Sequence, residues 1–536
     1  MAFVYKASLR HRCLFMLRIF YIVCLSFLTT VFRPVCAQLA QSLRLEIPSD
    51  PNEAEAFDVT PLGERGVLMT IRTGSFVDNT PVKLAFRKYD VNLNLLWQAE
   101  FKQDVKYRQV ATYDSDQYVY HLFREYDTDE YQFVRLHLDD GVVDTFEGSL
   151  IDQLDVQQFK VLGSQAFVSG YHHGRPVVMS FSFFDRTVKV LPGMYVNRME
   201  ISSLEIDEAR QEVHVLVHSL RRHCNFSIRT YNYDSKLLRT LDFDGASNSL
   251  ISGKLIPVNQ QESLLVGNYS TDCTPYSQGI YVTRLRHGDT GTEPASTIQY
   301  IEFSQLQNFF NYLKPQRQQK LLAKAQKKKD EGKDYKFRYR LLVHDLKPTA
   351  DGLTLVAEVY YPQYRGNTLA YGGYLRGNDR YEGFRYTHAF ICGFDKQGKL
   401  LWDNCFPIKE LLSTDLTEMV QVSQQKDRFV LAYPSDGEII TQVIQENKIL
   451  KETEKFKLQT NAENEKVTFS AQDNLMAWYG QHFLACGFQK IAPSRTAQRD
   501  VPQREVFYLN KLTYSEDNPV KDAGKSTTRK NAGSER

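Results

Sequence analysis

Tyrosine and arginine side chains are concentrated in one polar stretch, Pro362 to Phe384. Both types combine a flat surface with hydrogen-bond donors, and both are common among the residues that bind protein partners or stack on sugars. The stretch therefore predicts a binding surface, and a partly ordered loop that covers neighbouring elements is the alternative. The candidate binding residues are Tyr361, Tyr364, Arg365, Tyr371, Tyr374, Arg376, Arg380 and Tyr381.

A lysine-rich segment, residues 304–337, precedes this stretch. Its apolar residues have helical spacing on both sides of Pro315, where a new helix can begin, and Gly332 provides a stop. We expect either a solvated helical hairpin packed on a sheet edge or a basic arm. Such an arm would contact an acidic partner, an anionic glycan or lipid headgroups. The apolar positions are Leu306, Phe309, Phe310, Leu313, Leu321, Leu322 and Ala325, and the candidate binding residues are Lys320, Lys324 and Lys327.

Catalytic and metal-binding motifs are missing from the sequence. It has no Gly-x-Ser-x-Gly, His-Glu-x-x-His, P-loop or Cys-x-x-Cys metal pattern. His172, His173 and His223 stand in corresponding turns, but metal binding needs convergent ligands, so we expect no metal and no cofactor. Carboxylates that act together in glycoside cleavage cannot be placed from the sequence.

An internal repeat supplies the elements that position these residues. Tyr89-Asp90 is followed by Leu95-Leu96-Trp97, and Phe394-Asp395 by Leu400-Leu401-Trp402, at identical spacing. An apolar strand, an Asp-led turn and a second apolar strand predict a β-hairpin. Two further strand-like runs precede each hairpin, which gives units of four strands.

Such units, repeated without helices between them, predict a single all-β propeller over residues 43–513. The expected count is eight four-stranded blades, with seven as the alternative. The last unit lacks one strand, and the alternating run Leu43–Ile47 has no partner of its own. We therefore expect an N-terminal strand to close the ring and remove the exposed edges. The lysine-rich insertion then falls between blades five and six.

The Asp-turn-Leu-Leu-Trp hairpin resembles the quinoprotein-like and WD-like propeller repeats. This resemblance is one of fold and does not imply the cofactor of quinoprotein enzymes. In propellers, the connections between strands two and three share a face with the connections between blades. Nearly all long segments of this chain belong to that set, so we expect function on this long-loop face. Cys224 and Cys273 fall in equivalent loops of adjacent blades, which makes them candidates for a disulfide.

The two ends of the chain differ from the rest. Residues 1–37 have basic residues, an apolar run and Val35-Cys36-Ala37, which predicts a secretory signal, with a retained anchor as the weaker alternative. They hold five of the 66 basic residues and no acidic one, so the rest has 61 basic and 64 acidic residues. This balance gives no case for nucleic-acid binding. Residues 515–536 are polar and predict a disordered tail.

Together these features favour an exported protein that is periplasmic, outer-membrane-associated or secreted. We expect a non-catalytic binding or scaffold protein of the cell envelope, whose long-loop face at blades five and six binds a protein partner or an envelope glycan. Proximity to a membrane surface is compatible with the lysine-rich arm. The alternative is an envelope carbohydrate-active hydrolase or lyase with carboxylates near the central channel.

Overall fold

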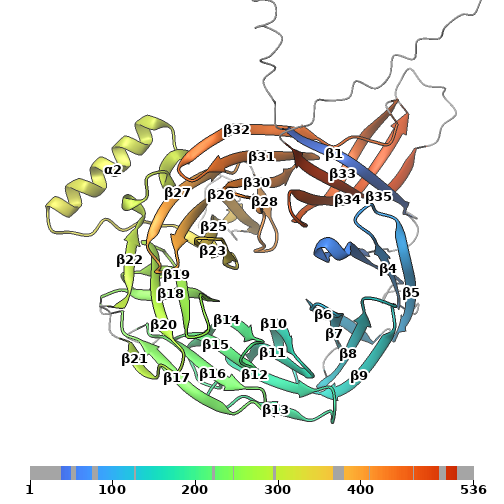
Figure 1. The fold of residues 1–536 in the computed structure, drawn as a ribbon, viewed down its shortest axis with the longest axis horizontal. Coiled ribbons are helices and arrows are strands. Elements are labelled where there is room, and N and C mark those ends of the chain that lie inside the picture. Colours follow the sequence, from blue (N-terminus) through green and yellow to red (C-terminus); the bar gives the residue numbers. More distant parts are fainter. Residues whose placement is uncertain are drawn as a thin grey trace, which may run out of the picture. The chain divides into compact units, whose positions relative to one another are not determined.

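The structure is a computed structural model that describes residues 38–49, 56–74, 82–104, 106–125, 128–219, 224–245, 247–293, 297–365, 380–409, 411–462, 464–493 and 503–515. Residues 43–511 form one compact unit. In it, eight sheets of four or more strands are arranged around a common axis as an eight-bladed β-propeller (Figure 1). The predicted secretory signal lies outside the described residues, and so does the predicted tail except for Ser515.

The first four blades follow one another along the chain, each with its strands in sequence order. Blade one has β2 (Ala56–Pro61), β3 (Val67–Thr73), β4 (Val82–Tyr89) and β5 (Leu95–Gln103), with a 3-10 turn η1 (Gly63–Arg65). Blade two has β6 (Tyr107–Asp114), β7 (Tyr118–Glu125), β8 (Glu130–His137) and β9 (Val143–Ser149). Blade three has β10 (Asp155–Leu162), β11 (Gln165–His172), β12 (Arg175–Ser182) and β13 (Val188–Val190). Blade four has β14 (Met199–Asp207), β15 (Glu212–Ser219), β16 (Phe226–Asn232) and β17 (Leu237–Phe243).

The later blades carry additions that the repeat did not predict. Blade five has β18 (Ser249–Pro257), β19 (Glu262–Ser270), β20 (Gly279–Arg286) and β22 (Gln299–Glu302), and its β21 (Gly291–Glu293) pairs in parallel with β17 of blade four. Blade six has β23 (Arg340–Val343), β25 (Gly352–Arg365), β26 (Arg380–Asp395) and β27 (Leu400–Pro407), with short strands β24 (Lys347–Pro348) and β28 (Leu412–Ser413). Blade seven has β29 (Gln421–Gln425), β30 (Arg428–Ser435), β31 (Glu438–Gln445) and β32 (Lys448–Lys457).

Blade eight is completed by the N-terminal strand. Its strand order is β1 (Gln38–Pro48), β35 (Arg504–Ser515), β34 (His482–Pro493) and β33 (Glu465–Ala477). Ile47 of β1 is buried in one cluster with Val59 and Met69 of blade one and Leu509 of blade eight. The structure thus confirms the predicted count of eight blades and the closing N-terminal strand.

The repeated aspartate makes the same turn in both blades where the repeat is clearest. Asp90 Oδ1 accepts hydrogen bonds from the backbone N–H groups of Asn92 and Asn94, both at 2.8 Å. Asp395 Oδ1 accepts the equivalent pair from Gln397 and Lys399, at 2.9 and 2.8 Å. A side chain that holds its own turn in this way sets the hairpin locally, which explains why the repeat could be recognised in the sequence.

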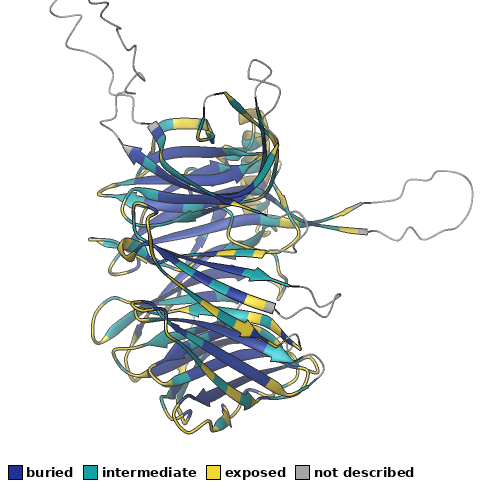
Figure 2. Cartoon of the chain, turned by 90° about the vertical axis from the view of Figure 1, so that its right-hand side faces the viewer, coloured by how far each residue is buried: buried dark blue, intermediate teal, exposed yellow. Residues whose placement is uncertain are grey.

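Packing between blades explains the rest of the repeat. The middle strands of each blade are buried on both faces, whereas the outermost strands alternate between half-buried and exposed residues (Figure 2). Trp97 on β5 donates its indole N–H to the Leu138 carbonyl of blade two at 3.1 Å. Its ring lies against Gly141, where a Cβ would come within 2.9 Å of it. Trp402 makes the corresponding contact with Phe429 of blade seven, with ring centroids 5.3 Å apart.

Candidate functional site

The insertion between blades five and six contains one α-helix, α2 (Pro315–Asp330), in place of the predicted helical hairpin. Its first part forms two 3-10 turns instead, η3 (Phe303–Gln305) and η4 (Phe309–Tyr312). Asp403 of β27 causes this difference, because its carboxylate accepts hydrogen bonds from the backbone N–H groups of Gln307 and Asn308 at 2.8 and 2.7 Å.

No helix in the described part of the chain is long and apolar enough to cross a bilayer.

The apolar side of the insertion packs on the propeller, as the spacing predicted. Phe309, Phe310 and Ala325 are buried in a cluster with apolar residues of blades five and six, and Leu321 and Leu322 pack against it partly exposed. The opposite side of α2 carries the candidate lysines, and Lys320, Lys324 and Lys327 are all exposed. The helix therefore lies at the outer edge of the ring beside β22 and β27 (Figure 1).

A cleft of about 820 Å³ separates α2 from the loops of blade five. Its lining mixes charges of both signs with aromatic rings and includes Tyr269, Asp272, Glu302, Leu322, Lys329 and Tyr335. Tyr269 is only 6% exposed and packs edge-on against Tyr300, with ring centroids 4.9 Å apart. Lys336, which also lines the cleft, forms an ion pair with Asp272. The cleft can hold a polar segment of a partner, since clefts of this size commonly accommodate ligands.

The two described ends of the tyrosine-rich stretch, residues 362–365 and 380–384, extend the strands β25 and β26. The β25–β26 ladder continues through Pro362↔Phe384, Gln363↔Gly383 and Tyr364↔Tyr381 to the last pair, Arg365↔Arg380. Tyr371, Tyr374 and Arg376 lie outside the described residues. Alternating polar and aromatic residues suit a pleated ladder, and Gln363 strengthens it by donating to Glu382 Oε2 at 2.7 Å.

This extension, which we call the blade-six arm (residues 361–365 and 380–384), projects from one side of the molecule (Figure 2). Tyr364 and Tyr381 are 56% and 44% exposed, and their ring centroids lie 5.6 Å apart. Tyr361 is 44% exposed. The structure places the described tyrosines of the arm on one hairpin and the candidate lysines on α2.

A disulfide joins the loops of blades four and five. Cys224 and Cys273, which the sequence suggested as partners, are bonded, with Cα atoms 5.6 Å apart. Both residues line a hollow of about 1050 Å³ that shares Ser247, Asn248 and Asp272 with the cleft beside α2. Cys392, Cys405 and Cys486 are buried free thiols. Cys405 lies opposite Phe390 and Cys392 opposite Asp403, so Cys392 and Cys405 are not direct partners across the β26–β27 ladder.

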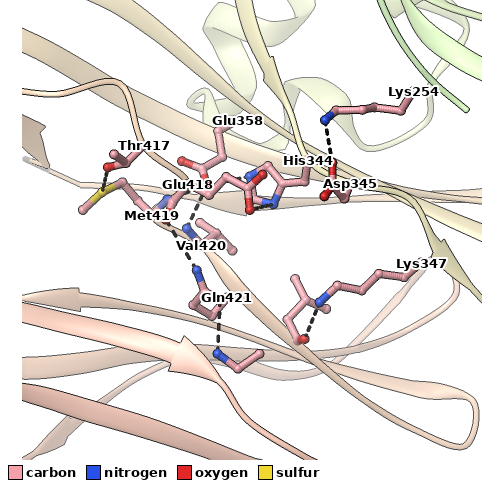
Figure 3. Close-up of polar contacts among 12 residues, drawn as sticks. Lys254, His344, Asp345, Lys347, Glu358, Thr417, Glu418, Met419, Val420 and Gln421 are labelled. Carbon is pink, nitrogen blue, oxygen red and sulfur yellow. Dashed lines mark hydrogen bonds and ion pairs between the residues drawn. The ribbon is translucent and has the colours of Figure 1, made fainter. Parts of the chain in front are cut away.

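A network of charged side chains links the inner strands of blades four to seven, and the sequence reasoning missed it (Figure 3). Lys254 of β18 is 2.5 Å from Asp345 and 3.7 Å from Glu205 of β14. His344 Nε2 lies 2.9 Å from Oε1 of the fully buried Glu358, and its Nδ1 lies 3.6 Å from Glu418. The same Glu358 oxygen accepts the backbone N–H groups of Met419 and Val420, both at 2.8 Å.

We call this group of side chains the axial network (Glu205, Lys254, His344, Asp345, Lys347, Glu358 and Glu418). Several of its members have shifted pKa values. Desolvation by the surrounding protein raises the pKa of Glu418, and the negative charges of Asp345 and Glu358 add to the effect. Burial lowers the pKa of Lys347. Burial alone would also lower the pKa of Lys254, but the carboxylates of Glu205 and Asp345 outweigh it and raise that pKa.

Part of the axial network is open to solvent. The side chains of Asp345 and Glu418 are 71% and 46% exposed, although desolvation by the protein acts on the pKa of both. A carboxyl group with a raised pKa beside a histidine can transfer protons. A usable signal did exist in the sequence, because Glu358 interrupts the apolar run Leu353–Tyr361.

Of the three histidines considered in the sequence, the structure describes two, at the turn between β11 and β12. His172 and His173 contact each other, with ring centroids 4.1 Å apart, and His172 Nδ1 lies 3.2 Å from the Tyr195 hydroxyl. His223 lies outside the described residues. Within the described ranges, no group of three or more His, Cys, Asp or Glu residues is arranged to hold a metal ion.

Comparison with known proteins found similar solved structures and no sequence relative. No protein-family model and no curated protein matches its sequence. Among solved structures, it is similar to the polysaccharide lyase Uly1, with a TM-score of 0.37, 9% identity and coverage of 75% of this chain and 89% of that chain. It is also similar to the Dos1 propeller, with a TM-score of 0.37, 11% identity and coverage of 89% and 95%. TolB from Acinetobacter baumannii matches with a TM-score of 0.29, 9% identity and coverage of 75% and 82%.

Proposed function

We propose that this protein is an exported, non-catalytic binding scaffold of the cell envelope and that a protein partner docks on the long-loop face of blades five and six. The observation that carries the proposal is the blade-six arm, a projecting hairpin with exposed tyrosines. Tyr364 and Tyr381 are 56% and 44% exposed and are held on a hydrogen-bonded ladder. A rigid aromatic surface loses little side-chain entropy when it binds, so such tyrosines make strong contacts.

Neighbouring features extend this surface. Leu412 on β28 pairs through its backbone with Arg385 of β26 and is 41% exposed, which adds apolar area beside the arm. The loops that line the cleft of about 820 Å³ and the disulfide-linked loops also lie on the long-loop face. They connect either strands two and three of a blade or one blade to the next. An elaborated face with an aromatic arm is typical of partner binding on repeat scaffolds. The Cys224–Cys273 disulfide fits an oxidising compartment and thus supports export.

The arm makes a direct prediction for partner capture. The double variant Tyr364→Ser/Tyr381→Ser removes two exposed rings that pack against each other and against Phe384 of the arm, so the fold should remain intact. Loss of two such anchors should weaken partner binding by about 2–4 kcal/mol, which is roughly 30-fold or more. Capture of a stoichiometric partner from envelope extract, followed by titration of the purified pair, measures the effect.

Tyr195→Ser provides the matched control, because Tyr195 is 44% exposed and lies in the connection between blades three and four, away from blades five and six. The control should bind its partner as the unchanged protein does. Equal capture by the arm variant and the unchanged protein would remove the arm from the interface.

A second candidate function has one observation in its favour, the solvent-open part of the axial network. Glu418, whose pKa is raised and whose side chain is 46% exposed, lies 3.6 Å from Nδ1 of the buried His344. This arrangement supports a carbohydrate-active hydrolase or lyase as the alternative, with Glu418 as the proton donor.

For this second candidate, Glu418→Gln should lower turnover of a polysaccharide by about a hundredfold or more, since general acid catalysis contributes at least that much. Release of reducing ends or of unsaturated sugars from a panel of polysaccharides is the readout. Glu452→Gln, on the exposed outer strand β32, is the control and should leave turnover unchanged. If the unchanged protein turns over none of the panel, the enzymatic alternative is wrong.

A further inference from the structure

Positive charge is concentrated around α2. Residues 314–338 contain ten Lys and Arg residues and three Asp and Glu residues. From Gln38 to the end, by contrast, the chain has 61 basic and 64 acidic residues. The segment therefore forms a strongly basic surface on a protein whose overall balance is slightly acidic. A charge separation of this size attracts an anionic partner over distances comparable to the Debye length.

The outward side of α2 has no counter-ions of its own. Arg317, Lys320, Lys324 and Lys327 follow the helix at intervals of three and four residues, so they share one side of it. All four are exposed, and no described carboxylate forms an ion pair with any of them. We call these four residues the α2 basic stripe.

The acidic residues near α2 belong to other partners. Glu331 pairs with Lys328 and Lys333, at 3.8 and 3.6 Å, and Glu302 lies 4.0 Å from Lys329. The apolar side of the helix is packed on the propeller through Ala325, which is 6% exposed. The stripe is thus held in place on a packed helix while its charges remain available to a partner.

We propose that the α2 basic stripe docks the propeller on an anionic phospholipid surface. Eight of the ten cations in residues 314–338 are lysines. A lysine acts as a point charge and suits mobile phosphate headgroups. Carboxylate or phosphate groups in fixed positions favour arginine instead, because its guanidinium forms two parallel hydrogen bonds. The stripe lies on a convex helix at the outer edge of the ring, which matches a flat surface better than a single polymer chain (Figure 1).

The position of the blade-six arm agrees with this assignment. The connection that holds α2 joins blades five and six, and the β25–β26 connection joins strands two and three, so both leave the sheets at the same end. The docking deepens the proposed function, because it places the partner-binding face beside the membrane. It rests on residues that partner capture by the arm does not use.

The test uses the chain from Gln38 to Arg536 and sedimentation with vesicles of phosphatidylcholine containing 0 or about 30% phosphatidylglycerol. Each cation near such a surface contributes about 1 kcal/mol, which is roughly fivefold in the partition coefficient. The variant R317Q/K320Q/K324Q/K327Q should therefore bind anionic vesicles several hundredfold more weakly. The unchanged protein should bind anionic vesicles at low salt. It should dissociate from them at 0.5 M NaCl, because salt screens the charges, and it should not bind neutral vesicles.

The control variant K396Q/K399Q/K426Q/K448Q removes the same net charge from exposed turns at the opposite end of the blades. It should retain vesicle binding within about twofold, and circular dichroism checks the fold of both variants. Equal losses in the two variants, or no binding to anionic vesicles, would overturn the proposal. So would binding to heparin without vesicle binding, which would assign the stripe to an anionic glycan. If partner capture persists in the stripe variant, the proposed function survives the failure of the docking.

Discussion

Deletion of Leu43–Ile47 is expected to cost on the order of 5 kcal/mol or more and to remove the single cooperative unfolding transition of the propeller. These residues form the part of β1 that completes blade eight, and their loss exposes the β35 edge to solvent. Ile47, which is 9% exposed, also leaves the core shared by blades eight and one. Full burial of one aliphatic side chain contributes about 1.5–3 kcal/mol, and Leu43 and Leu45 add to it.

Polar contacts enlarge the expected effect of the deletion. Arg44, whose side chain is 2% exposed, lies 2.7 Å from Glu46 and donates to Gln489 at 2.9 Å. Its guanidinium stands 5.0 Å from the Tyr508 ring. Glu46 in turn binds Arg504 at 2.7 Å, so removal of the strand leaves several partly buried groups without partners.

Calorimetric unfolding of the variant that lacks Leu43–Ile47 measures this effect. A variant that lacks residues 525–529 near the C-terminal end is the control. The C-terminal deletion should leave Tm unchanged. An unchanged Tm after removal of Leu43–Ile47 would show that β1 does not close the ring.

His388 is expected to make the propeller sensitive to acid. It is fully buried in β26, stacked on Tyr312 with ring centroids 3.8 Å apart, and edge-on to Phe309 at 5.0 Å. Burial lowers the pKa of His388 to about 3, whereas the unfolded chain binds the proton near its ordinary value of 6.5. The folded state thus binds fewer protons. Its stability is complete above pH 6.5 and is lost as the pH falls from 6.5 towards 3.

The variant His388→Phe keeps an aromatic ring in this stack and removes the titration. Each pH unit in this window corresponds to about 1.4 kcal/mol, so the full effect on the free energy of unfolding is on the order of 5 kcal/mol. Urea unfolding between pH 7 and 4 should show a shallower loss of stability for the variant than for the unchanged protein. Exposed His287→Phe serves as the control and should follow the unchanged protein. Parallel curves for His388→Phe and the unchanged protein would mean that His388 takes up its proton without unfolding.

The blades could be predicted because their signals are local. The carboxylates of Asp90 and Asp395 accept hydrogen bonds from backbone groups only two and four residues away, so a short segment of sequence determines the turn. The closing strand was found by a similar argument, since an alternating run without a partner matched a unit with one strand too few. Strands with alternating apolar residues, and the residues that form turns, can be recognised in the sequence because both patterns involve only near neighbours in the chain.

The candidate site was harder to predict because its contacts are distant in the sequence. Asp403 converts the Phe309 segment into a 3-10 turn from about a hundred residues away, and no local pattern encodes this contact. The axial network likewise joins Lys254 to Asp345 and Glu358 to Val420 across separate blades. Of the candidate tyrosines, Tyr361, Tyr364 and Tyr381 are exposed, but their arrangement on a strand ladder depends on pairing that residue types alone do not determine.

The central claim, that the blade-six arm is where a protein partner docks, is tested most directly by site-specific photo-crosslinking in intact cells. A photoreactive phenylalanine analogue is placed at Tyr364 in one strain and at Tyr195 in another, both exposed in the free protein. We expect one discrete crosslinked protein from position 364 and none from position 195. Crosslinks from position 195 alone, or none from position 364 under conditions that recover the partner complex, would contradict the proposed function.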